Sequence, residues 1–330
     1  MNARRLIPTA TIAGAVTLGL VALSACSSSD AATKKSGDKL AVTASFYPMQ
    51  FLAERIGGDH VSVTTLTKPG VEPHDLELNP RQVAQLGEAD VILYLKGIQP
   101  AVDEAITQSG VKNTVDATSL TTLEKHGTEV GHSHEGGHAD GHTAEESHPA
   151  GEEGSLDGKD PHIWLDPVKY AEVAKGVGAS LEKADPDNSA TYQKNTDALV
   201  KQLGGLDTAF KQGLADTTTK TFITTHAAFG YLAERYGLTQ EAIAGLDPES
   251  EPSPARVKEL ETIAEHDKVG TVFFETLASD KTAKTIAADS GLKTDVLDPL
   301  EGITDKSKGD DYIEVMNSNL AALQKALGAK

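Results

Sequence analysis

Short apolar runs alternate with amphipathic stretches along most of this 330-residue chain. Runs rich in β-branched and aliphatic residues are typical of buried strands, whereas apolar residues at three- and four-residue spacing predict helices. Both halves of the chain show this alternation. The expected strands are 39–46, 61–66, 91–95 and 114–116 in the first half and 221–224, 241–244, 271–274 and 294–297 in the second.

Helical patterns fill the intervals between these strands. Asn79 and Ser253 each precede a proline, which is the capping residue and first-turn proline of a helix, and Gly291 is a stop signal. The expected helices are 48–56, 80–88, 100–108, 227–236, 254–266, 280–289 and 311–327. Strands that alternate with helices predict an α/β fold. Because the alternation occurs twice, we expect two lobes, each a mainly parallel four-stranded sheet flanked by helices.

One longer helical pattern, from Asn188 to about Leu214, separates the two halves. Its main apolar positions recur at three- and four-residue steps after a weaker first interval: Tyr192, Leu199, Leu203, Leu206, Phe210 and Leu214. A single helix over this stretch would be about 40 Å long and would join the lobes rigidly. The pair Gly204 and Gly205 costs roughly 1 kcal/mol of helix propensity per glycine, so two shorter helices broken at this pair are the alternative.

The first 26 residues have the pattern of a lipoprotein export signal. Arg4 and Arg5 precede an apolar stretch that ends in small residues before Cys26, the only cysteine in the chain. We expect a signal peptide over 1–25, lipidation of Cys26 and a flexible tether over 26–38. An uncleaved membrane anchor is the alternative, because the apolar run is close to the lower limit for a membrane span.

The rest of the chain is too long for one typical core and divides at the long helix. We expect an N-terminal α/β lobe over 39–184, a linker helix over 185–217 and a C-terminal α/β lobe over 218–330. A formal charge of −19 makes the surface acidic, which disfavours nucleic acid as a partner. The hydropathy pattern predicts no second membrane span.

Isolated histidines stand near the ends of the expected strands. His74 lies in the loop after the second strand, and His226 directly follows the first strand of the second lobe. His162 lies in the segment after a polar insertion, and Asp298 directly follows the last strand. Open parallel sheets bind ligands beyond the carboxyl ends of their strands, so a cleft between the lobes could bring these four side chains together. Three imidazoles and one carboxylate suit tetrahedral Zn²⁺.

Each of these residues also has a purely structural interpretation. A histidine at a strand end often serves only local structure, and Asp298 before Pro299 could be a turn former. Glu275, at the end of the strand 271–274, is a rival carboxylate or a residue that supports the site. Trp164, close to His162 in the sequence, is a second candidate for such a supporting role.

Between His74 and His162 lies a stretch rich in histidine, glycine and acidic residues. Six histidines fall within 23 residues: His126, His132, His134, His138, His142 and His148. This composition cannot bury a core, so we expect a disordered loop over about 124–158. Several imidazoles on such a loop predict auxiliary metal binding of low affinity, because ordering the loop costs entropy. A merely solvated linker is the alternative.

Several of these stretches together resemble the zinc- and manganese-binding substrate-binding lipoproteins of ABC metal importers, the cluster A-I solute-binding proteins. The resemblance covers nearly the whole chain from residue 41 onward. The matching segments are 41–48, Glu72-Pro73-His74-Asp75, the run 160–167 around His162, the run 225–232 around His226, Glu251-Pro252-Ser253-Pro254 and Leu297-Asp298-Pro299-Leu300. Their order and spacing are specific, although no single motif is decisive.

The resemblance implies a ligand set and a metal. The implied ligands are His74, His162, His226 and Asp298, although three histidines and a water could also close the site. In manganese-type members the position that matches His226 is commonly a glutamate. Histidine at this position, together with the histidine tract, favours Zn²⁺ over Mn²⁺.

The same resemblance implies a function. The chain would be the extracytoplasmic Zn²⁺-binding component of an ABC importer, anchored to the cell membrane by lipid, which captures zinc between its lobes and delivers it to a permease with its ATPase. We expect a monomer without enzymatic activity. The alternatives are a manganese-binding member of the family, a zinc-dependent hydrolase and a surface adhesin. A hydrolase is disfavoured because four protein ligands leave no open position on the metal and no His-Glu-x-x-His sequence is present.

Overall fold

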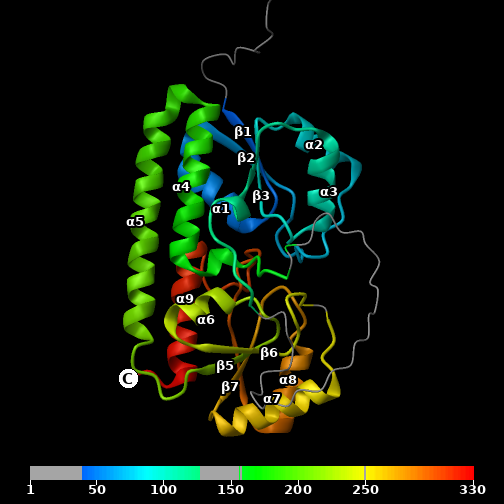
Figure 1. The fold of residues 1–330 in the computed structure, drawn as a ribbon, viewed down its shortest axis with the longest axis vertical. Helices are drawn as coiled ribbons and strands as arrows, with labels where there is room; N and C mark the ends of the chain where they lie inside the picture. The colour runs from blue at the N-terminus through cyan, green and yellow to red at the C-terminus, as the bar shows by residue number, and fades with distance from the viewer. Residues whose placement is uncertain (1–38, 127–155, 157, 249) are drawn as a thin grey trace, which may run out of the picture. The chain divides into compact units, whose positions relative to one another are not determined.

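The computed structural model describes residues 39–126, 156, 158–248 and 250–330, which contain two parallel sheets of four strands each (Figure 1). The N-terminal sheet has the order β2-β1-β3-β4, and the C-terminal sheet has the order β6-β5-β7-β8. The strands are β1 (Leu40–Ala44), β2 (Val61–Thr65), β3 (Val91–Tyr94), β4 (Thr114–Asp116), β5 (Thr221–Thr224), β6 (Thr239–Ala242), β7 (Thr271–Phe274) and β8 (Lys293–Val296). The predicted α/β fold with parallel four-stranded sheets is confirmed.

Helices connect the strands of both sheets. They are α1 (Tyr47–Gly57), α2 (Pro80–Glu88), α3 (Pro100–Ser109), α4 (Pro167–Ala184), α5 (Ser189–Gly213), α6 (Gly230–Tyr236), α7 (Pro254–His266), α8 (Lys281–Ser290) and α9 (Tyr312–Leu327). The predicted caps are present: the Asn79 side chain accepts from the backbone of α2, and Ser253 Oγ accepts from the Arg256 amide at the start of α7. Within the described part of the chain, none of the helices combines the length and apolar character that a membrane crossing requires.

The long helix α5 is unbroken from Ser189 to Gly213, so the alternative of two helices is wrong. Its predicted apolar face is buried, whereas Gly204 and Gly205 lie on its exposed face. A Cβ added at either glycine would meet nothing within 4 Å. The pair therefore costs helix propensity without interrupting any packing, which is why the helix continues through it.

Helix α4 is not among the helices that we predict from the sequence, although it packs against a large part of α5 (Figure 1). Its buried positions Tyr170, Val173, Val177 and Leu181 do recur at helical spacing, but two glycines interrupt the apolar signal. One of them, Gly178, has a packing role, because a Cβ there would collide with the Thr196 hydroxyl of α5. The glycine that weakens the helical pattern is thus what lets the two helices approach closely.

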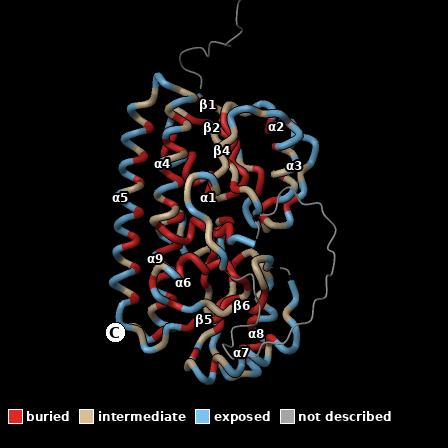
Figure 2. Tube along the Cα trace, in the orientation of Figure 1, coloured by how far each residue is buried: buried red, intermediate tan, exposed pale blue. Residues whose placement is uncertain are grey.

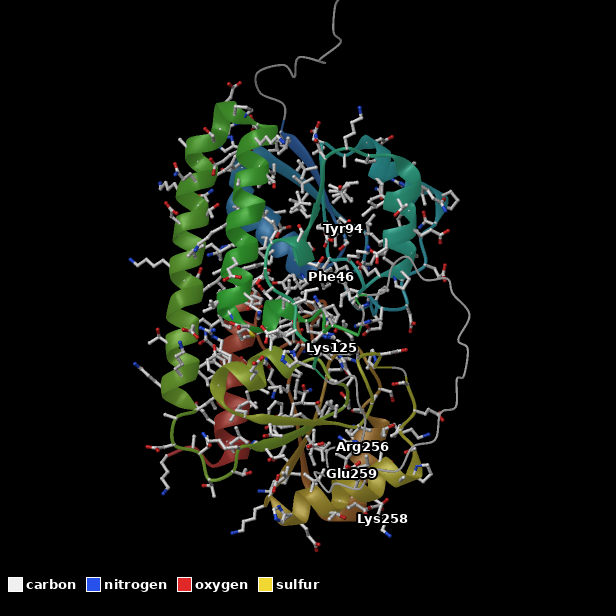
Figure 3. The ribbon with its side chains drawn as sticks, viewed as in Figure 1. Phe46, Tyr94, Lys125, Arg256, Lys258 and Glu259 are labelled. Atoms are coloured by element: carbon white, nitrogen blue, oxygen red, sulfur yellow. The ribbon has the colours of Figure 1, made fainter. Side chains whose placement is uncertain are left out.

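One continuous apolar core joins α1, α4, α5, α6 and α9 to both sheets (Figure 2). Trp164 lies fully buried in it, donates from Nε1 to the Pro299 carbonyl at 2.7 Å and accepts from the Tyr312 hydroxyl at 2.6 Å. Phe46, which follows β1 and is labelled in Figure 3, meets the Trp164 ring edge-on with centroids 5.1 Å apart. Loss of a buried tryptophan typically costs about 3–5 kcal/mol, so Trp164 fixes the segment that precedes α4 against the loop after β8.

Both sheets place their central crevice at the carboxyl ends of the strands. In each sheet the chain runs from a central strand, β1 or β5, to the edge strand beside it, β2 or β6. It then crosses to the strand on the other side of the central strand, β3 or β7. The connections that leave β5 and β7 diverge at this point, which is where open α/β sheets bind ligands. In each sheet this edge is therefore the expected position of a binding site.

Candidate metal centre

His226 is held rigidly at the end of the central strand β5. Its side chain is 1 % exposed, and its Nδ1 lies 2.8 Å from Oε1 of Glu275, which directly follows the neighbouring strand β7. Its carbonyl accepts from the Thr224 hydroxyl at 2.7 Å. A carboxylate on Nδ1 sets the tautomer so that Nε2 is free to bind a metal. Glu275 thus lies where a residue that supports His226 is needed.

His162 is held in the same way on a different element. It caps the 3-10 turn Ile163–Leu165, and its side chain is fully buried. Asp160 Oδ1 accepts from the His162 amide at 2.9 Å and lies 2.7 Å from His162 Nδ1. The Trp164 ring packs against the imidazole with centroids 5.1 Å apart. Nε2 therefore points away from Asp160, toward the carboxyl ends of the strands.

His74 comes from the loop after the edge strand β2 and is held less tightly. Its amide donates to Glu72 Oε1 at 3.2 Å, and its side chain is 14 % exposed. Its ring centroid lies 5.7 Å from that of His162 and 6.2 Å from that of His226. The structure therefore brings together the three histidines that the sequence singles out.

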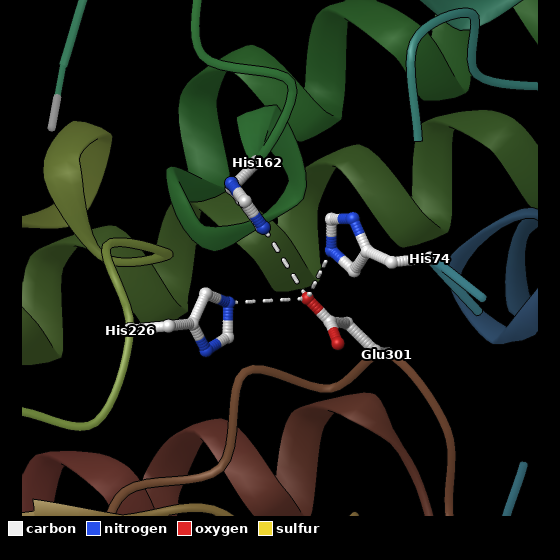
Figure 4. A group of neighbouring side chains, drawn as sticks. All are labelled: His74, His162, His226 and Glu301. Atoms are coloured by element: carbon white, nitrogen blue, oxygen red, sulfur yellow. Dashed lines mark hydrogen bonds and ion pairs between the residues drawn. The ribbon is translucent and has the colours of Figure 1, made fainter. Parts of the chain in front are cut away.

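The fourth member of the group is Glu301, from the loop after β8 (Figure 4). Its Oε1 lies 3.2 Å from Nε2 of His162, 3.3 Å from Nε2 of His74 and 3.5 Å from Nε2 of His226. In a tetrahedron whose metal–ligand bonds are 2.0–2.1 Å, the edges are about 3.3–3.4 Å long. The three distances from the carboxylate oxygen thus match those of a zinc-sized tetrahedron, and all four ligand atoms lie within 4.8 Å of one another.

Asp298, the predicted fourth ligand, does not lie in this group, because its carboxylate binds elsewhere. Asp298 Oδ1 accepts from the Leu300 amide at 2.8 Å, and Oδ2 accepts from the hydroxyls of Thr276 at 3.1 Å and Ser307 at 3.0 Å. The Asp298 amide donates to Asn319 Oδ1 at 2.9 Å, and Asn319 Nδ2 donates to the Asp298 carbonyl at 2.7 Å. Asp298 is an anchor for the turn and lies outside the imidazole group.

The anchored turn explains how Glu301 reaches the site. Leu300 has φ 60°, a left-handed conformation that is unfavourable for leucine. The hydrogen bond from its amide to Asp298 and the bond from Trp164 to the Pro299 carbonyl hold this conformation. The turn then places Glu301, fully buried, among the three imidazoles. Glu301 was missed because it and Asp298 share one loop, and the sequence carries no signal for a left-handed leucine.

Buried carboxylates near the group raise the pKa values of His162 and His226. Burial lowers the pKa of His226, but Glu275 and Glu301 outweigh it and hold that pKa well above 6.5. Burial likewise lowers the pKa of His162, and Asp160 and Glu301 raise it to a higher net value. Burial, Glu301 and Glu275 raise the pKa of Glu72 to about 9.

The donor atoms also fit a divalent metal chemically. Nε2 of His162, Nε2 of His226 and Oε2 of Glu301 are buried without a hydrogen-bond partner among the described residues. Buried polar atoms normally have a partner, so the two unpartnered imidazole nitrogens that face Glu301 Oε1 indicate a ligand site. Three imidazoles with one carboxylate are a typical zinc donor set.

Other predicted functional residues lie away from this group or outside the described chain. His126, the first histidine of the tract, is described and lies next to Asp160. Cys26, the lipidation candidate, and the five later histidines of the tract lie outside the described residues: His132, His134, His138, His142 and His148.

Comparison with known proteins identifies relatives of this chain. Residues 42–326 match the family model of the zinc-uptake complex component A, periplasmic (ZnuA). The zinc-binding lipoprotein AdcA of Streptococcus pneumoniae is 37% identical over 298 residues, which are 88% of this chain and 56% of AdcA. The chain thus spans little more than half of that relative. The high-affinity zinc uptake system protein ZnuA of Bacillus subtilis is 36% identical over 94% of this chain and 95% of its own.

A solved structure agrees with these relatives. The crystal structure of the Zn(II)-bound ZnuA-like domain of AdcA from Streptococcus pneumoniae superposes with a TM-score of 0.69 at 34% identity, covering 88% of this chain and 99% of that domain. The family match covers most of the chain and includes all four members of the His74–His162–His226–Glu301 group. This chain therefore belongs to the family of zinc-uptake complex component A proteins.

Proposed function

We propose that this protein captures Zn²⁺ between its two sheets and delivers it to a membrane permease of the ABC importer class. The ligands in this proposal are His74, His162, His226 and Glu301. The observation that carries it is the position of Glu301 Oε1, 3.2–3.5 Å from three Nε2 atoms. These distances match the edge of a zinc tetrahedron, and one carboxylate oxygen meets three imidazole nitrogens at once.

Zinc is favoured over manganese by the chemistry of the donors. Mn²⁺ prefers oxygen-rich, six-coordinate sites, whereas imidazole nitrogen suits Zn²⁺. The group has three imidazoles, and Glu301 supplies the oxygen ligand. The zinc-binding relatives support the same choice. Competition titration of the metal-free protein with Zn²⁺ and Mn²⁺ tests it, and tighter binding of Mn²⁺ would contradict it.

The ligand set can be tested with two carboxylate variants in the same loop. We expect Glu301→Gln to weaken Zn²⁺ binding more than about 100-fold, since it removes a charged ligand. Asp298→Asn should weaken it less, by about 10-fold or below, because Asp298 acts only through the turn. Isothermal titration with Zn²⁺ measures both, and Glu265→Gln on the exposed face of α7 is the charge-matched control. A larger effect of Asp298→Asn would restore the ligand set that the sequence suggested.

Delivery to a permease and attachment to a membrane complete the proposal. Membership of a zinc-uptake family supports an importer as the partner. Lipidation of Cys26 would hold the protein near that importer. Zinc-limited growth of cells with this gene deleted, rescued by the wild-type chain but not by the His226→Ala variant, tests the transport role. Growth that is indifferent to the deletion would contradict it.

A hydrolase is disfavoured by the position of Glu275, a candidate general base next to the group. Glu275 Oε1 accepts from the Thr225 hydroxyl at 3.0 Å and pairs with His226 Nδ1 at 2.8 Å, so it supports a ligand. With Glu301 as a fourth ligand, the metal would have no open position for water.

A further inference from the structure

A second group of metal-binding side chains lies on the opposite side of Asp160 from the three imidazoles of the centre. It consists of Glu124, His126 and Glu234, each of which offers one ligand atom within 4.8 Å of the others. His126 Nε2 lies 2.9 Å from Glu234 Oε2. Glu124 and Glu234 line an open cavity of about 500 Å³ next to α6, together with the cationic side chains Lys169 and Arg235.

Asp160 connects this group to the metal centre. Its Oδ1 lies 2.7 Å from Nδ1 of His162, and its Oδ2 lies 3.2 Å from Nδ1 of His126. A carboxylate on Nδ1 leaves Nε2 as the metal-binding atom of a histidine. One buried carboxylate therefore prepares two imidazoles, with His162 Nε2 directed at Glu301 and His126 Nε2 directed at Glu234.

The chain is built to hold His126 in this position. Gly230 begins α6, and a Cβ there would collide with His126 and lie 2.9 Å from Asp160 Oδ2. The Tyr231 ring packs edge-on against the imidazole with centroids 4.4 Å apart. The Tyr231 hydroxyl accepts from the Glu124 amide at 2.8 Å and donates to the Asp160 carbonyl at 2.8 Å. The imidazole is thus fixed by a glycine, an aromatic ring and a buried carboxylate, although its side chain is still 16 % exposed.

We propose that Glu124, His126 and Glu234 form a second, weaker site for a divalent metal such as Zn²⁺, joined to the main centre through Asp160. One nitrogen and two carboxylate oxygens supply three ligands, and water completes the coordination because Glu234 is 58 % exposed. Lys169 limits the affinity, since its Nζ lies 2.6 Å from Glu124 Oε1 and repels a cation. This proposal goes beyond the proposed zinc delivery and does not depend on it.

The experiment counts the zinc ions bound by the chain after five histidines of the histidine-rich tract have been substituted. The parent variant carries His132→Gln, His134→Gln, His138→Gln, His142→Gln and His148→Gln, so that the five later histidines of the tract no longer bind zinc. Isothermal titration with Zn²⁺ alone should give two equivalents, one tight and one at least about 100-fold weaker. A parent that binds only one equivalent overturns the proposal.

Single substitutions on this parent locate the second equivalent. His126→Gln and Glu234→Gln should each remove it and change the tight affinity less than about 3-fold, whereas Glu265→Gln, which removes an exposed charge on α7, should keep both. Lys169→Gln should tighten the second equivalent about 10-fold, because it removes the opposing charge. A second equivalent that survives both His126→Gln and Glu234→Gln overturns the proposal. Loss of the tight equivalent in the parent would instead overturn the proposed function.

Asp160→Asn tests the connection between the sites. It should weaken the tight equivalent about 10–100-fold, as expected for a carboxylate that orients a metal-binding histidine, and should also remove the weak one. A variant that loses only the tight equivalent would show that the two sites are independent. Circular dichroism of each variant without metal checks that the fold is kept.

Discussion

The two sheets have the same strand order but hold their histidines differently. His226 follows a central strand, is 1 % exposed and is fixed through Nδ1 by Glu275 on the next strand. His74 follows the edge strand β2 and is 14 % exposed. Among the described residues, no carboxylate lies on the second ring nitrogen of His74. A central strand has neighbours on both sides that can supply a supporting residue, whereas an edge strand has one.

This difference suggests a division of roles between His226 and His74. The C-terminal sheet supplies a preformed ligand, and Glu301 from the loop after β8 belongs to the same half. The N-terminal sheet supplies a ligand from a longer loop that can yield. A metal site that must both capture and release its ion needs such a yielding ligand, so His74 is where we expect the site to open. The following variants test this asymmetry.

The largest effect should separate the two histidines themselves. We expect His226→Gln to weaken Zn²⁺ binding more than about 1,000-fold, because its buried position leaves Glu275 and Glu301 unpaired. His74→Gln should cost only about 10–100-fold, because water can reach the vacated position. Isothermal titration of both variants measures the difference. Equal losses would show that the asymmetry of burial has no energetic consequence.

The next effect concerns the support of His226. Glu275→Gln keeps the size of the side chain but removes its charge, so we expect Zn²⁺ binding to weaken about 10–100-fold. The rate of zinc dissociation should rise more than the rate of association falls, because His226 loses its fixed orientation but stays accessible to the metal. Stopped-flow release of zinc to a chelator gives the rate. A variant with wild-type release would contradict the role given to Glu275.

The pH dependence should be steep because the raised pKa values of His226 and His162 let these ligands hold protons to a higher pH than a free histidine does. Metal must displace those protons, so Zn²⁺ affinity should fall about 10-fold per pH unit for each protonated ligand as pH decreases below the raised pKa values. In the metal-free protein the sign is opposite. A raised histidine pKa contributes stability that is present below about pH 6.5 and is lost as pH rises through the folded pKa.

Urea unfolding between pH 6 and 9 checks these signs. The metal-free protein should lose stability toward high pH, and the zinc-loaded protein should gain it relative to the metal-free one. The Glu275→Gln variant should reduce the first trend, because Glu275 is the main group that raises the pKa of His226. A metal-free protein that is most stable at pH 9 would contradict the assignment.

The smallest effect serves as a control for the whole comparison. Gly205 lies on the exposed face of α5 with open space around it, so Gly205→Ala should stabilise the protein by about 0.5–1 kcal/mol. Helix α5 lies beside the sheets and contributes no ligand. Zinc affinity should therefore stay unchanged while the urea midpoint rises, and a changed affinity would show that the helix transmits strain to the site.

Much of the fold could be predicted from the sequence, because capping residues and apolar periodicity are carried by residues close to one another in the chain. Asn79 before Pro80 began α2, and the boundaries of β5, α7 and β7 coincide with the predicted ranges. Helix α6 begins at Gly230, later than predicted, because the residues after His226 form a turn. Helix α4 escaped prediction because its contact with α5 depends on a glycine, which carries no apolar signal.

The sequence by itself determined the alternating strands and helices and the three histidines at the ends of the elements, because periodicity and residue chemistry are properties of neighbouring positions. Only the tertiary structure decided which carboxylate joins them. That choice rests on the left-handed Leu300 and on partners of Asp298 that lie elsewhere in the chain, Thr276 and Asn319. A hydrogen-bonded turn held by distant residues has no signature in its own segment, so Asp298 and Glu301 could be told apart only in three dimensions.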